Sequence, residues 1–169
     1  GTINFVSAPI PSKFSAGFLT DYGSFNTSRT IANVGIANET FGAVVQFLNY
    51  NSDGFKELPN GANTGFDKND VMAKFKIQSK RTSKIYNALE FKMVYADEDA
   101  NETYLGLTEE DFKTSPFKRY AGSQKDNITT KNNQFSITHT LKTNNYFSIT
   151  TTAYRNKFAR NWYKLNDVR

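Results

Sequence analysis

The segment Asp70–Gln78, with the sequence DVMAKFKIQ, decides the fold class of this chain because its side chains alternate in character without a break. One set of alternate positions is entirely apolar: Val71, Ala73, Phe75 and Ile77. The other set is mainly polar or charged: Asp70, Met72, Lys74, Lys76 and Gln78. Successive side chains of a β-strand point to opposite faces of its sheet, so this period of two predicts a strand with one apolar and one polar face.

The same alternation recurs on both sides of this segment. It predicts further strands at Thr2–Ser7, Lys13–Tyr22, Ser28–Ala37, Phe41–Tyr50, Ile85–Tyr95, Asn133–Lys142 and Tyr146–Arg155. The composition agrees, since the chain contains 15 Phe and 9 Tyr, and aromatic and β-branched side chains fit a pleated surface. We therefore expect an all-β fold, and we expect the final residues, Asn156–Arg169, to begin another loop.

The predicted connections alternate between short and long. Short turns are expected at residues 38–40, 80–83 and 143–145, and long loops at Asn51–Asn69 and Ala96–Lys131. Strands of about ten residues with short turns at one end and long loops at the other are typical of a transmembrane β-barrel. The pattern thus predicts an antiparallel up-and-down meander that is part of such a barrel, with apolar faces toward lipid and polar faces toward the lumen.

Composition and charge exclude several classes of protein. The net charge of +5 is dispersed without a basic run, so we expect no nucleic-acid partner. The chain has no cysteine, which removes disulfides, thiolate metal sites and cysteine nucleophiles. No apolar run approaches the roughly 18 residues of a transmembrane helix, and the first residues do not read as a signal peptide. Because they already resemble a strand, we expect these 169 residues to be a fragment.

The stretch Asn101–Tyr120 interrupts the alternation with the sequence NETYLGLTEEDFKTSPFKRY. Thr108 precedes three acidic residues, so it is expected to cap a short helix whose first turn is negatively charged. Ser115 precedes Pro116, and the residue before a proline is pushed out of the helical region. The sequence therefore predicts a structured loop with a defined beginning and end.

Several of these segments resemble TonB-dependent outer-membrane receptors. Residues 2–11 resemble the end of the plug domain, and LTDYGSFNTSRT resembles the first barrel hairpin. NSDGFKELPNGANTGFDKNDV is similar to the second extracellular loop of receptors of the ferric-citrate-transport type. ADEDANETYLGLTEEDFKTSPFKRYAGSQKD closely resembles their third loop, and its YLGLT, DF and PFKRY motifs are the most specific part.

The resemblance implies a function and a place in the cell. Residues 1–11 would be the end of the plug and its linker, and residues 12–169 the N-terminal strands of the barrel. The whole receptor would lie in the bacterial outer membrane and import a ferric siderophore or a ferric-citrate-like chelate. It would contact the TonB complex through the rest of its plug. We expect no enzymatic activity and no cofactor.

Candidate ligand-binding residues come mainly from the third loop. Ferric chelates are often anionic, and guanidinium and ammonium groups bind carboxylates. We therefore expect ligand contacts from four loop residues and from two residues of the lumen face: Lys118, Arg119, Tyr120, Tyr104, Arg29 and Gln46. Lys74 is a further lumen-facing candidate.

The remaining motifs do not predict chemistry. Asp97, Asp99 and Asn101 resemble the start of a calcium loop, but that loop's sixth-position glycine is missing. The single histidine, His139, has no accompanying nucleophile elbow, so a strand histidine with a local hydrogen bond is expected. The alternative to the receptor is a soluble β-sandwich that binds a ligand or acts in adhesion.

Overall fold

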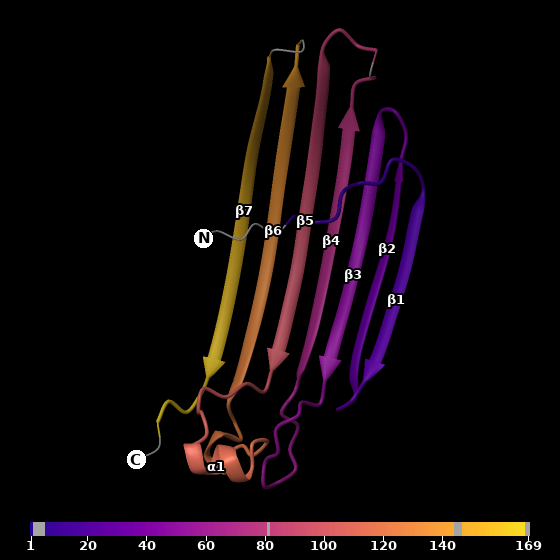
Figure 1. Cartoon of the computed structure of the whole chain (residues 1–169). Coiled ribbons are helices and arrows are strands. Elements are labelled where there is room, and N and C mark those ends of the chain that lie inside the picture. Colours follow the sequence, from indigo (N-terminus) through magenta and orange to yellow (C-terminus); the bar gives the residue numbers. More distant parts are fainter. Residues whose placement is uncertain (2–5, 81, 144–146, 168–169) are drawn as a thin grey trace.

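Seven strands form one antiparallel sheet whose order follows the sequence (Figure 1). The computed structural model describes residues 1, 6–80, 82–143 and 147–167. The strands are β1 Ser15–Gly23, β2 Thr27–Ala37, β3 Phe41–Ser52, β4 Phe66–Gln78, β5 Tyr86–Ala100, β6 Asn127–Lys142 and β7 Ser148–Tyr163. The helices are α1 Glu109–Thr114 and the short 3-10 helix η1 Ala121–Ser123. The predicted all-β, up-and-down meander is confirmed.

The strands nearest the C-terminus are longer than the sequence pattern predicts. The predicted loop Ala96–Lys131 shrinks to residues 101–126, because the polar residues of 97–99 pair with 129–131. The prediction that Asn156–Arg169 is a loop is wrong for residues 156–163, which complete β7. These ends continue the ladder because each of their residues is paired with a residue of β6. Of the predicted strand Thr2–Ser7, residues 2–5 lie outside the described chain, and Val6 and Ser7 are not in a strand.

The pairing register separates the side chains onto two faces, because directly paired residues point to the same side. One face carries a continuous set of uncharged side chains, which we call the apolar band. Its members are Ala32, Val34, Ile36, Phe41, Ala43, Val45, Phe47, Val71, Ala73, Phe75, Ile77, Leu89, Phe91, Met93, Tyr95, Phe135, Ile137 and Leu141. The middle of the opposite face carries amides and charges: Asn33, Gln46, Lys74, Lys76, Glu90, Lys92 and Gln134.

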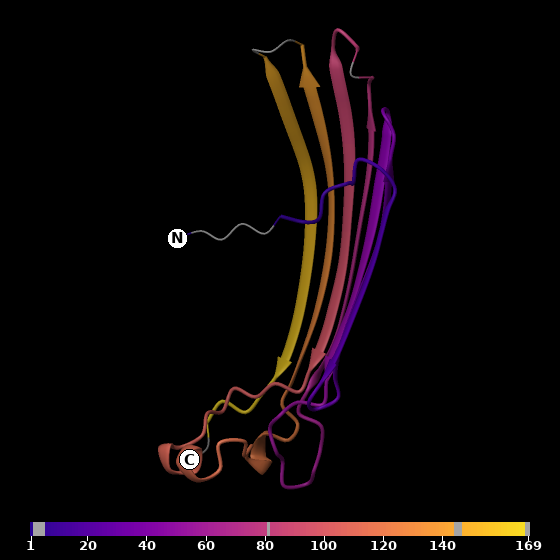
Figure 2. The same ribbon diagram turned by 45° about the vertical axis from the view of Figure 1, so that its right-hand side comes forward.

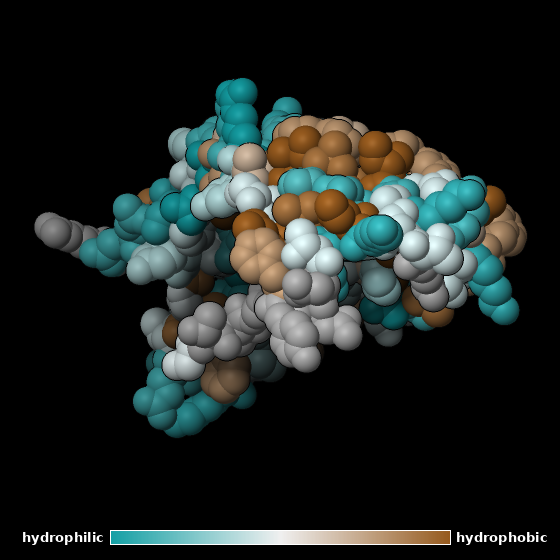
Figure 3. Space-filling view, turned by 90° about the horizontal axis from the view of Figure 1, so that it is seen from above, coloured by the Kyte–Doolittle hydropathy of each residue, from teal (hydrophilic) through white to brown (hydrophobic). Residues whose placement is uncertain are grey.

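The sheet bends, and the two faces lie on opposite sides of the bend. Figure 2 shows the strands bowed, with the segment of residues 6–14 on the concave side. Lys74, on the charged face, contacts that segment, so the charged face is the concave one and the apolar band is convex. Figure 3 shows the hydrophobic side chains gathered along one outer side of the molecule.

The apolar band is exposed in the described chain. Val45, Phe75 and Met93 retain 45%, 41% and 55% of their accessible surface. The described strands all belong to one sheet, so no second sheet covers the band and the predicted sandwich alternative is not formed in this part of the chain. The helices that the structure describes are also too short to cross a membrane.

Residues 6–14, the N-terminal strap, cross the concave face. The ammonium group of Lys74 donates hydrogen bonds to the carbonyl oxygens of Ser7 (3.3 Å) and Ala8 (2.8 Å). A side chain at Gly35 would collide with Pro11, since an ideal Cβ there lies 2.6 Å from the Pro11 Cγ. The strap therefore rests in a notch that only glycine leaves open, and a cation in β4 holds it there.

Removing the cation is expected to release the strap. Hydrogen bonds from a charged group contribute about 1.5–3 kcal/mol each, so we expect Lys74→Met to accelerate tryptic cleavage after Lys13 by roughly tenfold or more. Mass spectrometry of the N-terminal fragment gives the rate. Lys76→Met is the matched control, because Lys76 shares the face and the strand but has no described bond to the strap. Equal rates in the two variants would contradict this role of Lys74.

Candidate functional site

The long connections gather at one end of the sheet and form a loop cluster. It consists of residues 53–65, residues 101–126 and the C-terminal residues 164–167 (Figure 1). The first two loops pair through a short parallel bridge, in which the Glu57 amide donates to the Phe117 carbonyl at 2.7 Å. The Arg119 amide in turn donates to the Glu57 carbonyl at 2.9 Å. Backbone pairing thus joins segments about 60 residues apart into one unit.

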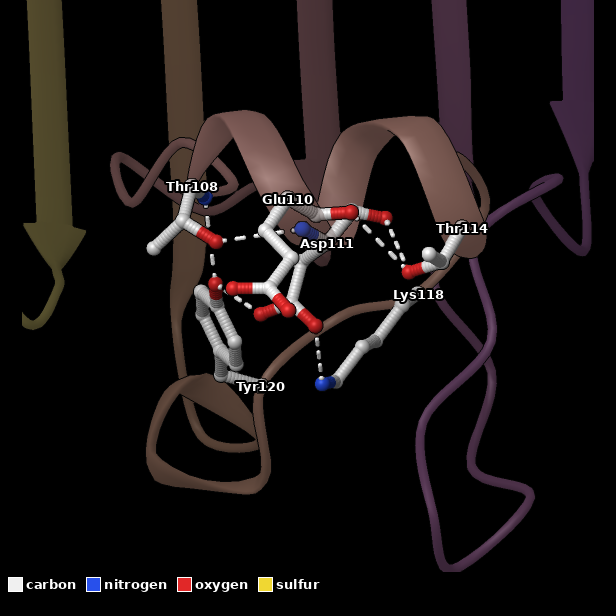
Figure 4. A network of polar contacts seen from close by, with 6 residues as sticks. All are labelled: Thr108, Glu110, Asp111, Thr114, Lys118 and Tyr120. Atoms are coloured by element: carbon white, nitrogen blue, oxygen red, sulfur yellow. Dashed lines mark hydrogen bonds and ion pairs between the residues drawn. The ribbon is translucent and has the colours of Figure 1, made fainter.

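The predicted capped helix is present as α1. The Thr108 hydroxyl accepts a hydrogen bond from the Asp111 amide at 3.2 Å, as expected of an N-cap residue. The helix ends at Thr114, directly before the residue that precedes Pro116. The carbonyl of Glu110 accepts a hydrogen bond from the Thr114 hydroxyl at 3.0 Å (Figure 4). The start and the stop of this helix were both predicted correctly.

Asp111 is the centre of a polar network below α1 (Figure 4). Its carboxylate accepts one hydrogen bond from Lys118 at 2.7 Å and another from the Tyr120 hydroxyl at 2.6 Å. The bond from Lys118 has the largest effect in lowering the pKa of Asp111, and the bond from Tyr120 lowers it further. The same contact with Asp111 raises the pKa of Lys118. Two of the predicted ligand-binding residues are therefore already engaged with a carboxylate of their own chain.

Arg119 lies inside the loop cluster, only 3% exposed. Its guanidinium donates to the Ser123 hydroxyl at 3.1 Å, to the Ser123 carbonyl at 2.6 Å and to the Asp126 carbonyl at 3.2 Å. It also donates to the carbonyl of Asn101. A buried fork with these acceptors stabilises the loop. The hypothesis that Arg119 binds a ligand stays a prediction, since its guanidinium is engaged within the chain.

The other predicted residues occupy separate places. Tyr104 lies at the beginning of the loop of residues 101–126, the third loop, and packs against Trp162, with ring centroids 5.8 Å apart. Arg29 is on the concave face of β2 and donates to Asp21 at 2.8 and 2.6 Å. Gln46 is on the concave face nearer the middle of the sheet, in β3. The structure therefore brings Lys118 and Tyr120 together but does not assemble the predicted residues into a single site.

Two buried residues that organise the loop were missed by the sequence analysis. Asp126 is 2% exposed and Ser123 is fully buried. The Asp126 carboxylate accepts hydrogen bonds from the Thr103 hydroxyl and from the Leu165 amide, both at 2.9 Å. No periodicity marks an aspartate of this kind, because its partners lie 23 and 39 residues away in the sequence.

A polar hollow of about 590 Å³ lies where the strands meet the loops. Its lining is rich in amides and carboxylates: Asn51, Asp53, Asn63, Asp67, Asp99, Asn101 and Asn127. Many of these groups bond one another, as Asn127 does with Asp99 at 2.6 Å. No group of metal-ligating residues was found among the described residues. His139 makes the local contact that was expected, with the Asn87 side chain at 3.2 Å.

Comparisons with known proteins gave no match, either to a protein family, to a curated protein or to a solved structure. The resemblance to TonB-dependent receptors therefore remains a prediction from motifs.

The Asp111 network is expected to be lost in acid. A lowered pKa means that Asp111 stabilises the loop at pH values above its ordinary pKa of about 4. This contribution decreases as the pH falls through the lowered pKa and the carboxylate is protonated. We predict that hydrogen exchange in residues 108–120 accelerates below about pH 4, beyond the intrinsic pH effect measured in an unfolded peptide.

The matched variants separate Asp111 from its neighbours. Asp111→Asn is expected to give fast exchange at neutral pH and to remove the acid-dependent change. Glu110→Gln, which alters an exposed acid of the same helix, is expected to behave like the unmodified chain. An acid-dependent change that persists in Asp111→Asn would show that another group is responsible.

Proposed function

We propose that this sheet is part of the wall of a β-barrel in the bacterial outer membrane, and that the barrel is a receptor for a ferric chelate. The main support is the distribution of side chains over the bent sheet. The convex side carries the apolar band, and the concave side carries Lys74, Lys76, Glu90 and Lys92. A membrane barrel needs this arrangement, with apolar residues toward lipid and polar residues toward the interior.

The apolar band also runs obliquely across the paired strands. In the row Phe47–Val71–Tyr95–Asn133–Lys157, the residues are apolar as far as β5 and polar from β6 onward. In the row Asn87–Leu141–Ile149, the order is reversed. Strands of a barrel tilt against its axis, so a band perpendicular to the axis must cross the rows at an angle. The oblique course of the apolar band therefore supports a barrel wall made of tilted strands.

The lengths of the connections indicate which end of the proposed barrel faces the outside of the cell. At the end with the loop cluster, the connections are residues 24–26, 53–65 and 101–126. At the opposite end, the described connecting residues are 38–40, 79–80 with 82–85, and 143 with 147. In outer-membrane barrels the longer loops are extracellular and the shorter turns periplasmic. The loop cluster would therefore face the outside of the cell.

The strap fits the interior of such a barrel. It crosses the concave face, where Lys74 binds its backbone, and residues 1–11 would be the end of a plug domain. Import would then be driven through the plug by the TonB complex, without covalent chemistry. The assignment to ferric siderophores or ferric citrate rests on the motifs of the third loop, and the loop cluster supplies the surface that would first meet the chelate.

Single-cysteine variants test whether the sheet forms part of a membrane-inserted barrel wall, because the chain has no cysteine of its own. The chain is refolded with lipid vesicles, and a nitroxide label is placed on the convex positions Val45 and Phe75 or on the concave positions Gln46 and Lys76. We expect convex labels to collide mainly with oxygen dissolved in lipid and concave labels mainly with a water-soluble nickel complex. Equal access of the nickel complex to both faces would contradict insertion. Refolding is checked by circular dichroism.

Binding of iron(III) citrate tests the receptor assignment separately. Vesicles that contain the chain are expected to bind radiolabelled iron(III) citrate above the level of empty vesicles. If the loop cluster attracts the anion, Lys118→Gln weakens binding several-fold through the loss of a nearby positive charge. Lys84→Gln makes the same charge change in the turn at the opposite end and is expected to have no effect. Lack of binding, or equal weakening by both variants, would overturn the assignment to a ferric chelate. The proposal that the sheet is part of a barrel wall would be unaffected.

A further inference from the structure

An aromatic corner lies at the edge of the loop cluster. Trp162, near the end of β7, and Tyr104, in the third loop, stand nearly perpendicular, with an angle of 79° between the rings and 5.8 Å between their centroids. The ammonium group of Lys164 lies 3.5 Å from the Tyr104 centroid and 4.3 Å from the Trp162 centroid. We call Tyr104 and Trp162 the ammonium corner, because both rings contact the same cation.

This geometry is suited to an ammonium ion. The face of an aromatic ring carries a negative potential, and a cation within about 6 Å of the ring centroid is attracted to it. The Arg160 guanidinium also lies 5.8 Å from the centroid of Trp162, so the indole already attracts two cations. Rings that share one ammonium group are the arrangement by which proteins recognise alkylated ammonium ligands.

Buried contacts hold both sides of the corner in place. The Asp126 carboxylate binds the hydroxyl of Thr103, next to Tyr104, through one oxygen. Its other oxygen accepts from the amide of Leu165, next to Lys164. One buried carboxylate thus sets the spacing between the third loop and the C-terminal segment. The corner is built before any ligand arrives, which reduces the cost of binding.

The corner is open to solvent on its Tyr104 side, where the ring retains 59% of its accessible surface, whereas Trp162 and Lys164 are half-buried. A lysine side chain held between rings loses rotamer freedom, and its primary ammonium is strongly hydrated. Lys164 is therefore an occupant that a more weakly hydrated cation can replace. Its tether gives it a high effective concentration, which makes it a competitor for the site.

We propose that the ammonium corner binds the alkylated ammonium group of an external ligand, and that Lys164 is a built-in occupant that the ligand displaces. This site is distinct from the proposed capture of an anionic chelate and does not depend on it. The ligand class is an organic cation with an accessible quaternary or tertiary ammonium group.

Trp162 is the single tryptophan of the chain, so its fluorescence reports on the corner alone. The probe is tetramethylammonium chloride, titrated against an equal concentration of sodium chloride. Because a cation–π contact contributes about 0.5–2 kcal/mol, we expect Lys164→Ala to tighten binding about 2- to 30-fold over the unmodified chain. Lys125→Ala, which removes another exposed lysine of the cluster, is expected to leave the affinity unchanged.

Ring variants distinguish a binding site from a general effect of salt. In the Lys164→Ala background, Tyr104→Leu is expected to abolish the fluorescence response, whereas Tyr104→Phe retains it because the aromatic face remains. Circular dichroism confirms that each variant is folded. A response of Lys164→Ala that equals the sodium chloride response, or that survives in Tyr104→Leu, would overturn the proposal.

Discussion

The register of backbone pairing is the constraint on which the rest of this structure depends. Each strand is joined to the next by antiparallel pairing over most of its length, and directly opposed residues share a face. A slip of one residue would move every apolar side chain of a strand to the charged side. Local turn chemistry opposes such a slip. The Asn38 side chain, for example, accepts hydrogen bonds from the amides of Thr40 and Phe41 and thereby fixes the turn between β2 and β3.

The two faces of the sheet differ in the amount of apolar surface that they leave exposed. The convex apolar band is far larger than the isolated apolar residues normal for a protein surface, and contiguous patches of this kind mark interaction surfaces. The described chain buries few hydrophobic side chains, among them Val44 and Met72 on the concave side. Backbone pairing therefore defines the shape of the sheet, while its apolar surface remains available to a surrounding phase or partner.

The strands were predictable because alternation is a local signal. A segment such as Asp70–Gln78 contains its own information about which side chains share a face. The helix after Thr108 was predictable for the same reason, since its cap and its stop lie within nine residues. The ends of β5 and β7 were not predictable, because only the neighbouring strand shows that those residues are paired.

The loop residues show more clearly what could not be predicted from the sequence. Arg119 is adjacent to Lys118 in the sequence, and the two were predicted to share a role. The structure buries the guanidinium among carbonyl groups and leaves the ammonium on a carboxylate near the surface. This difference depends on contacts with residues such as Asn101 and Asp126. The meeting of Tyr104 with Lys164, 60 residues later, likewise has no local signal.

Because the apolar band runs obliquely across the strands, the pairing of two residues does not place them at the same depth in a membrane. In the proposed barrel, residues joined across neighbouring strands are not at equal distances from the membrane midplane. Tyr95 and Asn133 are direct partners, yet one belongs to the band and the other lies beyond its edge. Lines of equal depth therefore run diagonally over the sheet. A lipid that lies against this wall would contact each successive strand nearer the end that carries the short turns.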